Sequence, residues 1–293
     1  MRAFVTGASG FVGGFLTRHL KSAGDDVDTM PDGVDIADEA ALAALVGAAR
    51  PDVVYHLAAL AHVGRSWDEP AETMRVNALG TLSVLEAVRR ADSPARVILV
   101  SSAEVYGAGN GEPINEAAPL RPTNPYAASK VAAEFLGLQA HLGRGTDVVR
   151  ARPFNHVGPG QADAFVVSAL AKRIVEAERS GGPIEVGNLA AARDFTDVSD
   201  VVRAYRLLAL HGVAGEVYNV ASGHAITIAA LLSRLVGLAD VPIEAIEEPS
   251  LFRPVDVPLL VGDSSRLVAL TGWQPEVDLG ETLAAVLQYW REH

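Results

Sequence analysis

The sequence predicts an α/β fold, a doubly wound parallel sheet followed by a smaller mixed α/β part. Short apolar runs alternate with helical segments through the first half of the chain. A glycine-rich turn follows the first of these runs, and the second half keeps alanine-rich helices that prolines and short strands interrupt. Strands and helices that take turns form right-handed βαβ units, whose strands lie parallel in one sheet.

The first half provides five strands and four helices in alternation. The expected strands cover residues 3–6, 27–30, 52–57, 96–100 and 146–150; the run at 96–100 is almost purely apolar, as in a strand buried on both faces. Apolar residues from 12 to 20 recur at helical spacing until Gly24 closes the helix. The other helices are expected at 38–49, ending at Arg50-Pro51, at 70–91 and at 125–142.

The second half is less regular. We expect helices at 164–180, 199–210, 226–235 and 279–290. We place a domain boundary at residue 155, giving domains 1–155 and 156–293, with the chain crossing back to the first domain around 190–220. The carboxyl ends of the parallel strands should face a cleft between the two domains.

Composition excludes several classes of protein. Of 293 residues 36 are acidic and 24 basic, a net charge of −12, which argues against nucleic acid or an anionic membrane as partner. There is no cysteine, so disulfides, cysteine-bound metals and a thiol nucleophile are excluded, and we expect no metal site. No apolar run approaches the roughly 18 residues of a membrane span, and no leader is visible, so we expect a cytoplasmic protein.

The turn TGASGFVGG places Gly7, Gly10 and Gly13 between a strand and a helix. Such glycines allow a tight turn, close approach of the backbone to a pyrophosphate, and close packing of helix on sheet. An ordinary glycine-rich turn is the alternative, but the strand–turn–helix context favours a dinucleotide site. The residues expected to contact the dinucleotide here are Gly7, Ser9, Gly10, Phe11, Val12 and Gly13.

The choice between NAD(H) and NADP(H) rests on the end of the second strand. An acidic residue there binds the ribose hydroxyls of NAD, whereas an arginine favours NADP. The segment reads Asp28-Thr29-Met30-Pro31-Asp32 and contains no arginine. Asp32 therefore favours NAD(H), although Pro31 occupies the usual acidic position, and both cofactors stay open.

A proton-transfer site is predicted from three side chains. Tyr126 and Lys130 stand four residues apart, on one face of the helix expected at 125–142. Free tyrosine has a pKa of about 10, and a nearby ammonium favours the phenolate, so we expect Lys130 to lower the pKa of Tyr126. Ser102, at the end of the strand 96–100, can polarise a carbonyl or an alcohol, and Glu104 can face the same pocket.

On these motifs the chain resembles the extended short-chain dehydrogenases, which act on nucleotide-linked sugars. The resemblance covers the whole chain and includes the glycine spacing, Asp35-Ile36, HLAA at 56–59, Asn77, SSAEVYG and PYAASK. It implies that Ser102, Tyr126 and Lys130 do the chemistry and that Lys130 holds the nicotinamide ribose. The further cofactor contacts that it implies are Asp35, Ile36, Leu57, Ala58, Ala59, Asn77, Ser101 and Pro153.

The second half resembles one branch of this family, the GDP-4-keto-6-deoxy-D-mannose reductases and GDP-mannose 4,6-dehydratases. The shared stretches are RPFNHVGPGQ, VGNLAAARDFTDV, GEVYNVASG, RPVD and TGWQP. The resemblance implies that Pro153 and Phe154 pack on the nicotinamide. It also implies that the sugar nucleotide, GDP-linked, is bound by Ser102, Glu104, Asn155, Val186, Asn188, Arg193 and Arg253.

Within that branch the sequence favours the reductase. The link between the second and third strands is short and lacks the arginine-rich stretch expected of the dehydratases, although Glu104 matches their active-site glutamate. Ala103 argues against the dTDP-glucose dehydratases, which carry an aspartate there. The expected reaction is reduction of GDP-4-keto-6-deoxy-D-mannose to GDP-D-rhamnose. The alternatives are a 4,6-dehydratase, a 4-epimerase, or a non-catalytic dinucleotide sensor, which the Tyr–Lys pair disfavours.

The resemblance also implies a homodimer. Small residues recur in the helices expected at 70–91 and 125–142, and small side chains let helices approach closely across an isologous interface. Packing of the same residues on the chain's own sheet is the alternative. The residues concerned are Ala78, Gly80, Ser83, Ala87, Ala128, Ala132, Ala133 and Gly137.

Overall fold

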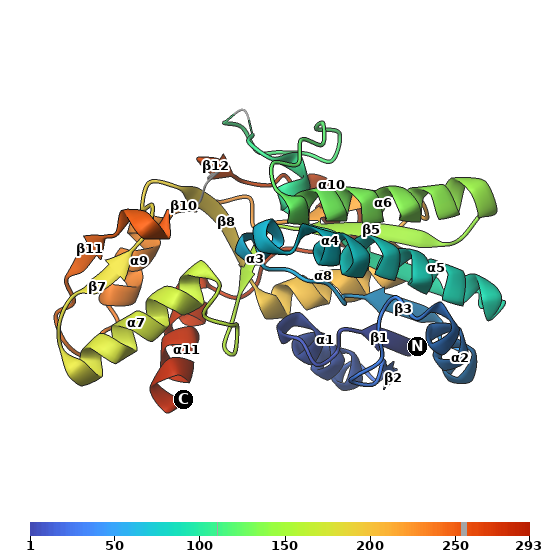
Figure 1. Cartoon of the computed structure of the whole chain (residues 1–293), viewed down its shortest axis with the longest axis horizontal. Helices are drawn as coiled ribbons and strands as arrows, with labels where there is room; N and C mark the ends of the chain where they lie inside the picture. The colour runs from blue at the N-terminus through green and yellow to red at the C-terminus, as the bar shows by residue number, and fades with distance from the viewer. Residues whose placement is uncertain (110, 253–256) are drawn as a thin grey trace.

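The structure, a computed structural model, describes residues 1–109, 111–252 and 257–293. Within these residues the larger part is a six-stranded parallel sheet in the order β2-β1-β3-β4-β5-β9 (Figure 1). The strands are β1 (Arg2–Thr6), β2 (Asp26–Thr29), β3 (Val53–His56), β4 (Arg96–Val100), β5 (Val148–Pro153) and β9 (Val217–Val220). The predicted doubly wound sheet is confirmed. Its strand order reverses between β1 and β3, which places the ligand crevice at the carboxyl ends of these two strands.

Helices cover both faces of this sheet. On one face lie α1 (Phe11–Ser22) and α8 (Val198–His211), which pack on each other and share a hydrophobic core with β1, β3 and β5. On the other face lie α2 (Glu39–Ala49), α5 (Gly80–Arg90) and α6 (Pro125–Arg144). Asp38 caps α2 by accepting the Ala41 N–H at 3.0 Å, and Arg50 ends it in the left-handed region at φ 44°.

The helix expected at 70–91 is interrupted. It consists of α4 (Pro70–Met74), a π-helical segment (Arg75–Leu79) and α5. The π turn directs Asn77 inward, where its amide bonds to the backbone of Leu60. This contact is non-local, so helical periodicity could not predict it; π turns of this kind are frequent at functional sites.

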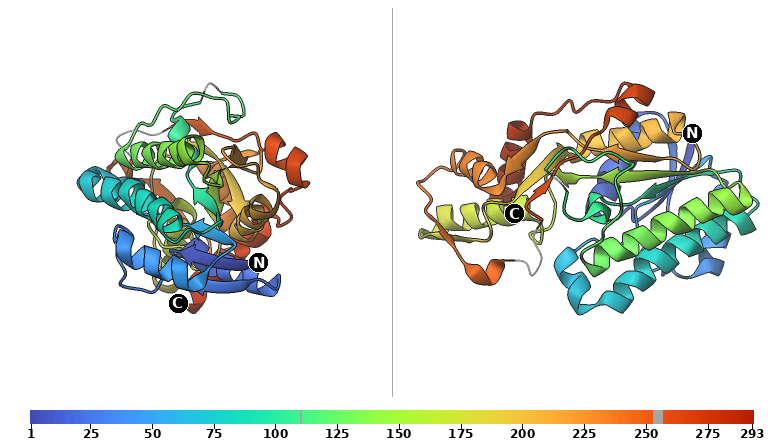
Figure 2. Two further views of the ribbon diagram at one scale, coloured as in Figure 1. Left: turned by 90° about the vertical axis from the view of Figure 1, so that its right-hand side faces the viewer. Right: turned by 90° about the horizontal axis from the view of Figure 1, so that it is seen from above.

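A second lobe lies beyond one end of the sheet (Figure 2). Its helices are α7 (Val166–Ser180), α9 (Ile228–Val236) and α11 (Leu279–Glu292), which agree with three of the expected segments. They enclose a separate core around Ile174, Leu231 and Leu287, beside β7 (Ile184–Val186) and its partner β11 (Ala245–Glu247). The sequence did not place these short strands, nor α3 (Val63–Asp68) and α10 (Ser265–Thr271).

The chain passes between the two lobes more than once. Strand β8 (Ala192–Asp197) pairs with β6 (Asn155–Val157), β10 (Ala225–Thr227) and β12 (Leu259–Leu260) and leads directly into α8 on the large sheet. Residues 198–220 thus belong to the layers of the first lobe, and Trp273 is buried in the same core. A division of the chain at residue 155 stays a prediction. Among the described residues, no helix is both long and apolar enough to cross a membrane.

Candidate active site

The glycine turn brings β1, α1 and the end of β3 into close contact. Gly7 has φ +72°, and a Cβ there would lie 2.7 Å from the Ala58 nitrogen. A Cβ on Gly13 would lie 2.1 Å from the Gly7 carbonyl oxygen. Both positions therefore require glycine. Gly10 begins α1 and, among the described residues, no side chain caps this helix, so its first N–H groups suit a pyrophosphate.

The remaining predicted turn residues surround this helix start. Ser9 is exposed in the turn, and Phe11 and Val12 form the first residues of α1. The Phe11 ring stacks on His156 from the junction with the second lobe, with centroids 6.4 Å apart and planes 4° apart. This contact fixes the turn against β6.

Buried hydrogen bonds hold the segment after β3, Leu57–Ala59. The His56 ring is buried and bonds Thr6 at 2.8 Å and Thr81 at 2.9 Å. Burial lowers the pKa of His56 to about 3, with the Lys130 ammonium contributing in the same direction, so the ring stays neutral. Asn77, predicted to bind the cofactor, uses its amide to hold Leu60 and donates to Ser129 of α6 at 2.8 Å.

The acidic residues near β2 differ in their environment. Asp32 is exposed beyond β2. Asp35 accepts two hydrogen bonds from Arg75, at 2.7 and 3.0 Å, and one from the Ala37 N–H, which together hold its pKa below the usual range. Ile36 is buried, and a Cβ on Gly80 would lie 2.8 Å from its side chain. The lack of a side chain at Gly80 therefore leaves the space that Ile36 fills.

The structure brings Tyr126, Lys130 and Ser102 together at the carboxyl end of β4. Helix α6 begins at Pro125, where Asn124 accepts the Ala127 N–H at 2.8 Å and directs Tyr126 to the strand end. The Lys130 ammonium lies 6.0 Å from the centroid of the Tyr126 ring and donates to the Val100 carbonyl at 2.9 Å. The Ser102 side chain hydrogen-bonds the Tyr126 phenol.

Burial controls the protonation of this group. It raises the pKa of Tyr126 to about 12, an effect that Ser102 opposes and Glu104 reinforces. Burial also lowers the pKa of Lys130 to about 8, against the influence of Glu134. The expected lowering of the tyrosine pKa by Lys130 is therefore not found. Desolvation of a fully enclosed phenol outweighs an ammonium that is directed at a backbone carbonyl.

Glu104 lies beside this group, as expected, in the 3₁₀ turn Ala103–Tyr106. Its carboxylate accepts the Asn124 amide at 3.1 Å and faces Tyr126 closely enough to raise the pKa of the phenol. Glu104 and Tyr126 are thus joined through Asn124, the residue that caps α6.

Ser101 is turned away from the cleft. Its hydroxyl donates to Glu134 of α6 at 2.5 Å, and the cofactor contact expected of Ser101 stays a prediction. Glu134 also accepts Arg152 Nε at 2.8 Å and Nη2 at 2.6 Å, and both charged side chains are buried. Arg152 in turn donates to the Tyr106 hydroxyl at 2.9 Å. Sequence reasoning missed this pair, although Glu134 follows Lys130 by one helical turn.

Pro153 and Phe154 are both buried at the end of β5. The Phe154 ring packs on Tyr106, with centroids 6.3 Å apart, and a Cβ on Gly262 would lie 2.6 Å from it. Phe154 thus belongs to a hydrophobic cluster with Tyr106 and Ala221, and the expectation that its ring packs on nicotinamide stays a prediction. Pro153 immediately precedes it, and its contact with the ring stays a prediction.

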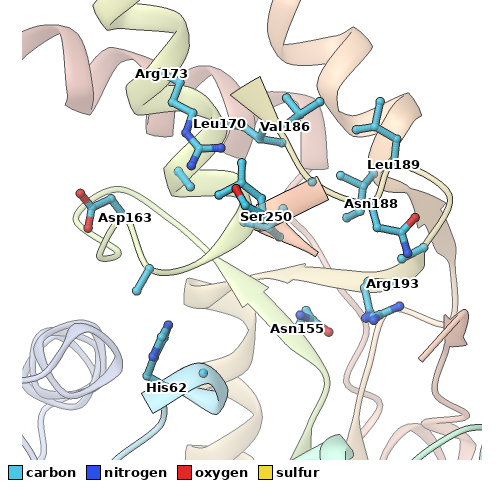
Figure 3. Close-up of a pocket in the computed structure, with 18 residues that line it drawn as sticks. His62, Asn155, Asp163, Leu170, Arg173, Val186, Asn188, Leu189, Arg193 and Ser250 are labelled. Atoms are coloured by element: carbon cyan, nitrogen blue, oxygen red, sulfur yellow. The ribbon is translucent and has the colours of Figure 1, made fainter. Parts of the chain in front are cut away.

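A cavity of about 460 Å³ lies between His62 and Gly64 of the first lobe and the second lobe (Figure 3). Four of the predicted substrate residues line it: Asn155, Val186, Asn188 and Arg193. Arg193 is buried in β8, next to Asp194, whose carboxylate accepts the backbone N–H groups of Ser222, Gly223 and Gly262. Arg253 lies outside the described residues. The cavity is also lined by His62, Asp163 and Arg173, which were not among the predicted site residues.

The doubly wound sheet, the glycine turn and the Ser–Tyr–Lys group define an extended short-chain dehydrogenase/reductase, a class of NAD(P)-dependent enzymes. Comparison with known proteins is more specific. The family model described as GDP-mannose 4,6 dehydratase matches residues 29–286, and the chain belongs to this family.

The relatives of this chain carry out several related reactions. The GDP-6-deoxy-D-mannose reductase of Pseudomonas aeruginosa is 39% identical over 99% of this chain and 97% of its own length. The UDP-glucose 4-epimerase of Mycolicibacterium smegmatis is 32% identical over 99% of both chains. Among solved structures, RMD from Pseudomonas aeruginosa complexed with NADPH has a TM-score of 0.92 and 37% identity, covering 100% of this chain and 99% of its own.

Proposed function

We propose that the protein reduces GDP-4-keto-6-deoxy-D-mannose to GDP-D-rhamnose with a nicotinamide cofactor. A reductase needs a proton donor beside the carbonyl that it reduces, and Tyr126, whose pKa burial raises to about 12, is protonated at neutral pH. The convergence of Tyr126, Lys130 and Ser102 at the carboxyl end of β4 is the observation that carries the proposal. The similarity to the GDP-6-deoxy-D-mannose reductase supports it over nearly the whole chain.

The chain's own residues supply acid catalysis and orientation. Tyr126 donates its proton to the C4 oxygen as negative charge develops there, and Ser102 donates a hydrogen bond to the same oxygen. Lys130, fixed by the Val100 carbonyl, holds the ribose hydroxyls. The bound reduced nicotinamide supplies the hydride. Arg193 and Asn155, which line the cavity, hold the diphosphate and the sugar.

The cofactor is NAD(H) or NADP(H), as it is among the solved relatives. We propose that the chain prefers NAD(H), because an added phosphate on the adenine ribose would meet Asp32 and no arginine or lysine occurs from residue 22 to residue 49. Arg75, which contacts this segment from the π-helical turn, already pairs with Asp35 and Glu72. Comparing kcat/KM for NADH and NADPH tests this preference.

The second candidate function is a dehydratase, favoured by the position of Glu104 beside Tyr126. Two incubations separate the candidates. A reductase consumes reduced cofactor in equal amount to added GDP-4-keto-6-deoxy-D-mannose, and leaves GDP-mannose unchanged. A dehydratase turns GDP-mannose into the 4-keto sugar without added reductant. Accumulation of that keto sugar would overturn our proposal.

We also propose that the enzyme is a homodimer, formed through the outer faces of the π segment, α5 and α6. Most of the small residues expected at this interface face the chain's own core: Ala78, Ala87 and Ala133 are at most 4% exposed. Large apolar side chains face outward instead, with Leu79 at 50% and Phe135 at 55% exposure. The π segment and α5 both pack against α6, and exposed apolar side chains such as these are of the kind that a second copy covers.

A further inference from the structure

The structure also bears on which base the sugar nucleotide carries, an inference that rests on the proposed function. Arg173 projects from α7 into the cavity, on the side opposite Asn155 and Arg193 (Figure 3). Its position in the cavity lining gives it access to a bound ligand.

Helix α7 relates the catalytic group to Arg173. At its start, the Phe165 ring meets His62 of the first lobe edge to face, with centroids 6.3 Å apart. The helix therefore begins beside the catalytic lobe. Arg173 lies seven residues after the first helical residue, Val166, which places it about 10 Å further along the axis at 1.5 Å per residue.

A nucleotide-diphosphate sugar bound in this cavity has its sugar at the catalytic group, its diphosphate next and its base last. We assign the portion beside Arg193 and Asn155, which line the cavity, to the sugar and the diphosphate, as in the proposed function. The portion between them and Arg173 is lined by apolar side chains, Leu170, Val186 and Leu189. Apolar walls suit the faces of a flat base and not a charged diphosphate. With the faces of the base against these walls, Arg173 would face its edge.

The guanidinium of Arg173 is held in one direction. Its Nη1 donates to the Glu185 carbonyl at 2.7 Å, and a guanidinium has five N–H donors in a fixed fork, so further donors remain. Such a fork pairs best with two adjacent acceptors. Guanine presents O6 and N7 side by side, adenine presents N7 beside an amino donor, and uracil or thymine presents only O4.

We propose that Arg173 selects guanine by donating two hydrogen bonds to O6 and N7 of the base. It is then a specificity-determining residue of the sugar-nucleotide site. If Arg173 instead bound a phosphate, its loss would weaken all nucleoside diphosphates equally. The two roles make opposite predictions for an analogue that differs from GDP at one ring atom.

Calorimetric titration of the full chain with GDP, 7-deaza-GDP, ADP and UDP makes this test. The wild-type protein should bind GDP at least about fivefold more tightly than each of the other three, because 7-deaza-GDP lacks N7 and the others lack the acceptor pair. Arg173→Met should bind GDP and 7-deaza-GDP equally. Arg179→Met is the matched control, because Arg179 lies on the same helix, donates to the Arg291 carbonyl at 2.8 Å and does not line the cavity, and it should keep the wild-type order.

Three results would overturn the assignment. The first is equal binding of GDP and 7-deaza-GDP by the wild-type protein, a measurement that needs no variant. The second is an undiminished preference for GDP in Arg173→Met, and the third is an equal loss for all four ligands. Turnover of the keto sugar is a separate readout. If turnover fails while the preference for GDP depends on Arg173, the proposed reaction is wrong and the base assignment stands.

Discussion

The carbonyl oxygen of Gly7 occupies the space where a side chain on residue 13 would begin. A Cβ on Gly13 would lie 2.1 Å from that oxygen and 2.6 Å from the Ala8 Cα, both backbone atoms that cannot move without opening the turn. The neighbouring Gly14 differs, because the nearest atom to its added Cβ is an Arg18 guanidinium nitrogen at 3.7 Å. A side chain at Gly13 would thus clash with the backbone of the turn, whereas the adjacent Gly14 has room for one.

We therefore expect Gly13→Ala to lower the free energy of unfolding by at least about 2 kcal/mol and to weaken cofactor binding. Gly14→Ala should leave binding intact and stabilise the helix by about 0.5–1 kcal/mol, since alanine restricts the unfolded chain. Urea unfolding and titration with reduced cofactor measure both effects. Equal behaviour of the two variants would contradict the packing described here.

A second prediction concerns the clamp between Glu134 and Arg152. Glu134 lies on α6, one turn beyond Lys130, and joins Ser101, which directly follows β4, to Arg152 of β5. Glu134→Leu or Arg152→Leu leaves a buried charge unpaired, which should cost about 3–5 kcal/mol. The double variant should cost less than the sum of the two. Glu69→Gln, in an exposed pair with Arg65, is the control and should cost at most about 1 kcal/mol.

The catalytic assignment predicts a selective loss in Tyr126→Phe. Removing the proton donor should lower kcat about a hundredfold or more, while titration shows nearly unchanged cofactor binding. Tyr106→Phe is a matched control. Tyr106 is also a buried tyrosine, but its hydroxyl bonds Arg152 and Asn219, so its loss should affect stability and not the turnover of folded enzyme. An active Tyr126→Phe enzyme would refute the assignment.

The local features of the fold and site could be predicted from the sequence, and the non-local ones could not. The glycine turn and the Tyr126–Lys130 spacing are each contained within a few residues, and the long strands and helices follow from periodicity. The strands of the second lobe have two to six residues and exist through pairing with distant segments. The roles of Phe154 and Asn77 depend on Tyr106 and Leu60, which no local pattern connects to them.

The proposed dimer predicts a change of assembly in Phe135→Asp. Phe135 is 55% exposed on α6, so a carboxylate there costs the isolated chain little but would be buried in the interface. Light scattering coupled to gel filtration should give twice the 30.7 kDa chain mass for the wild type and a single chain mass for the variant. Leu210→Asp, exposed on α8, is the control and should not change the mass. A monomeric wild-type protein would contradict the dimer.

The buried ammonium of Lys130 predicts a pH-dependent gain in stability for Lys130→Met. Burial lowers the pKa of Lys130 from 10.5 to about 8. Below pH 8 the folded protein bears the full cost of burying the charge. Between pH 8 and 10.5 the unfolded chain holds more protons, so wild-type stability rises with pH and the cost disappears. Lys130→Met, though inactive, should melt above the wild type at pH 7, and this advantage should shrink toward pH 10.5, where loss of the Val100 hydrogen bond remains. Thermal unfolding in cofactor-free buffer measures it. A difference in melting temperature that is constant across this range would show that burial of the charge carries no such cost.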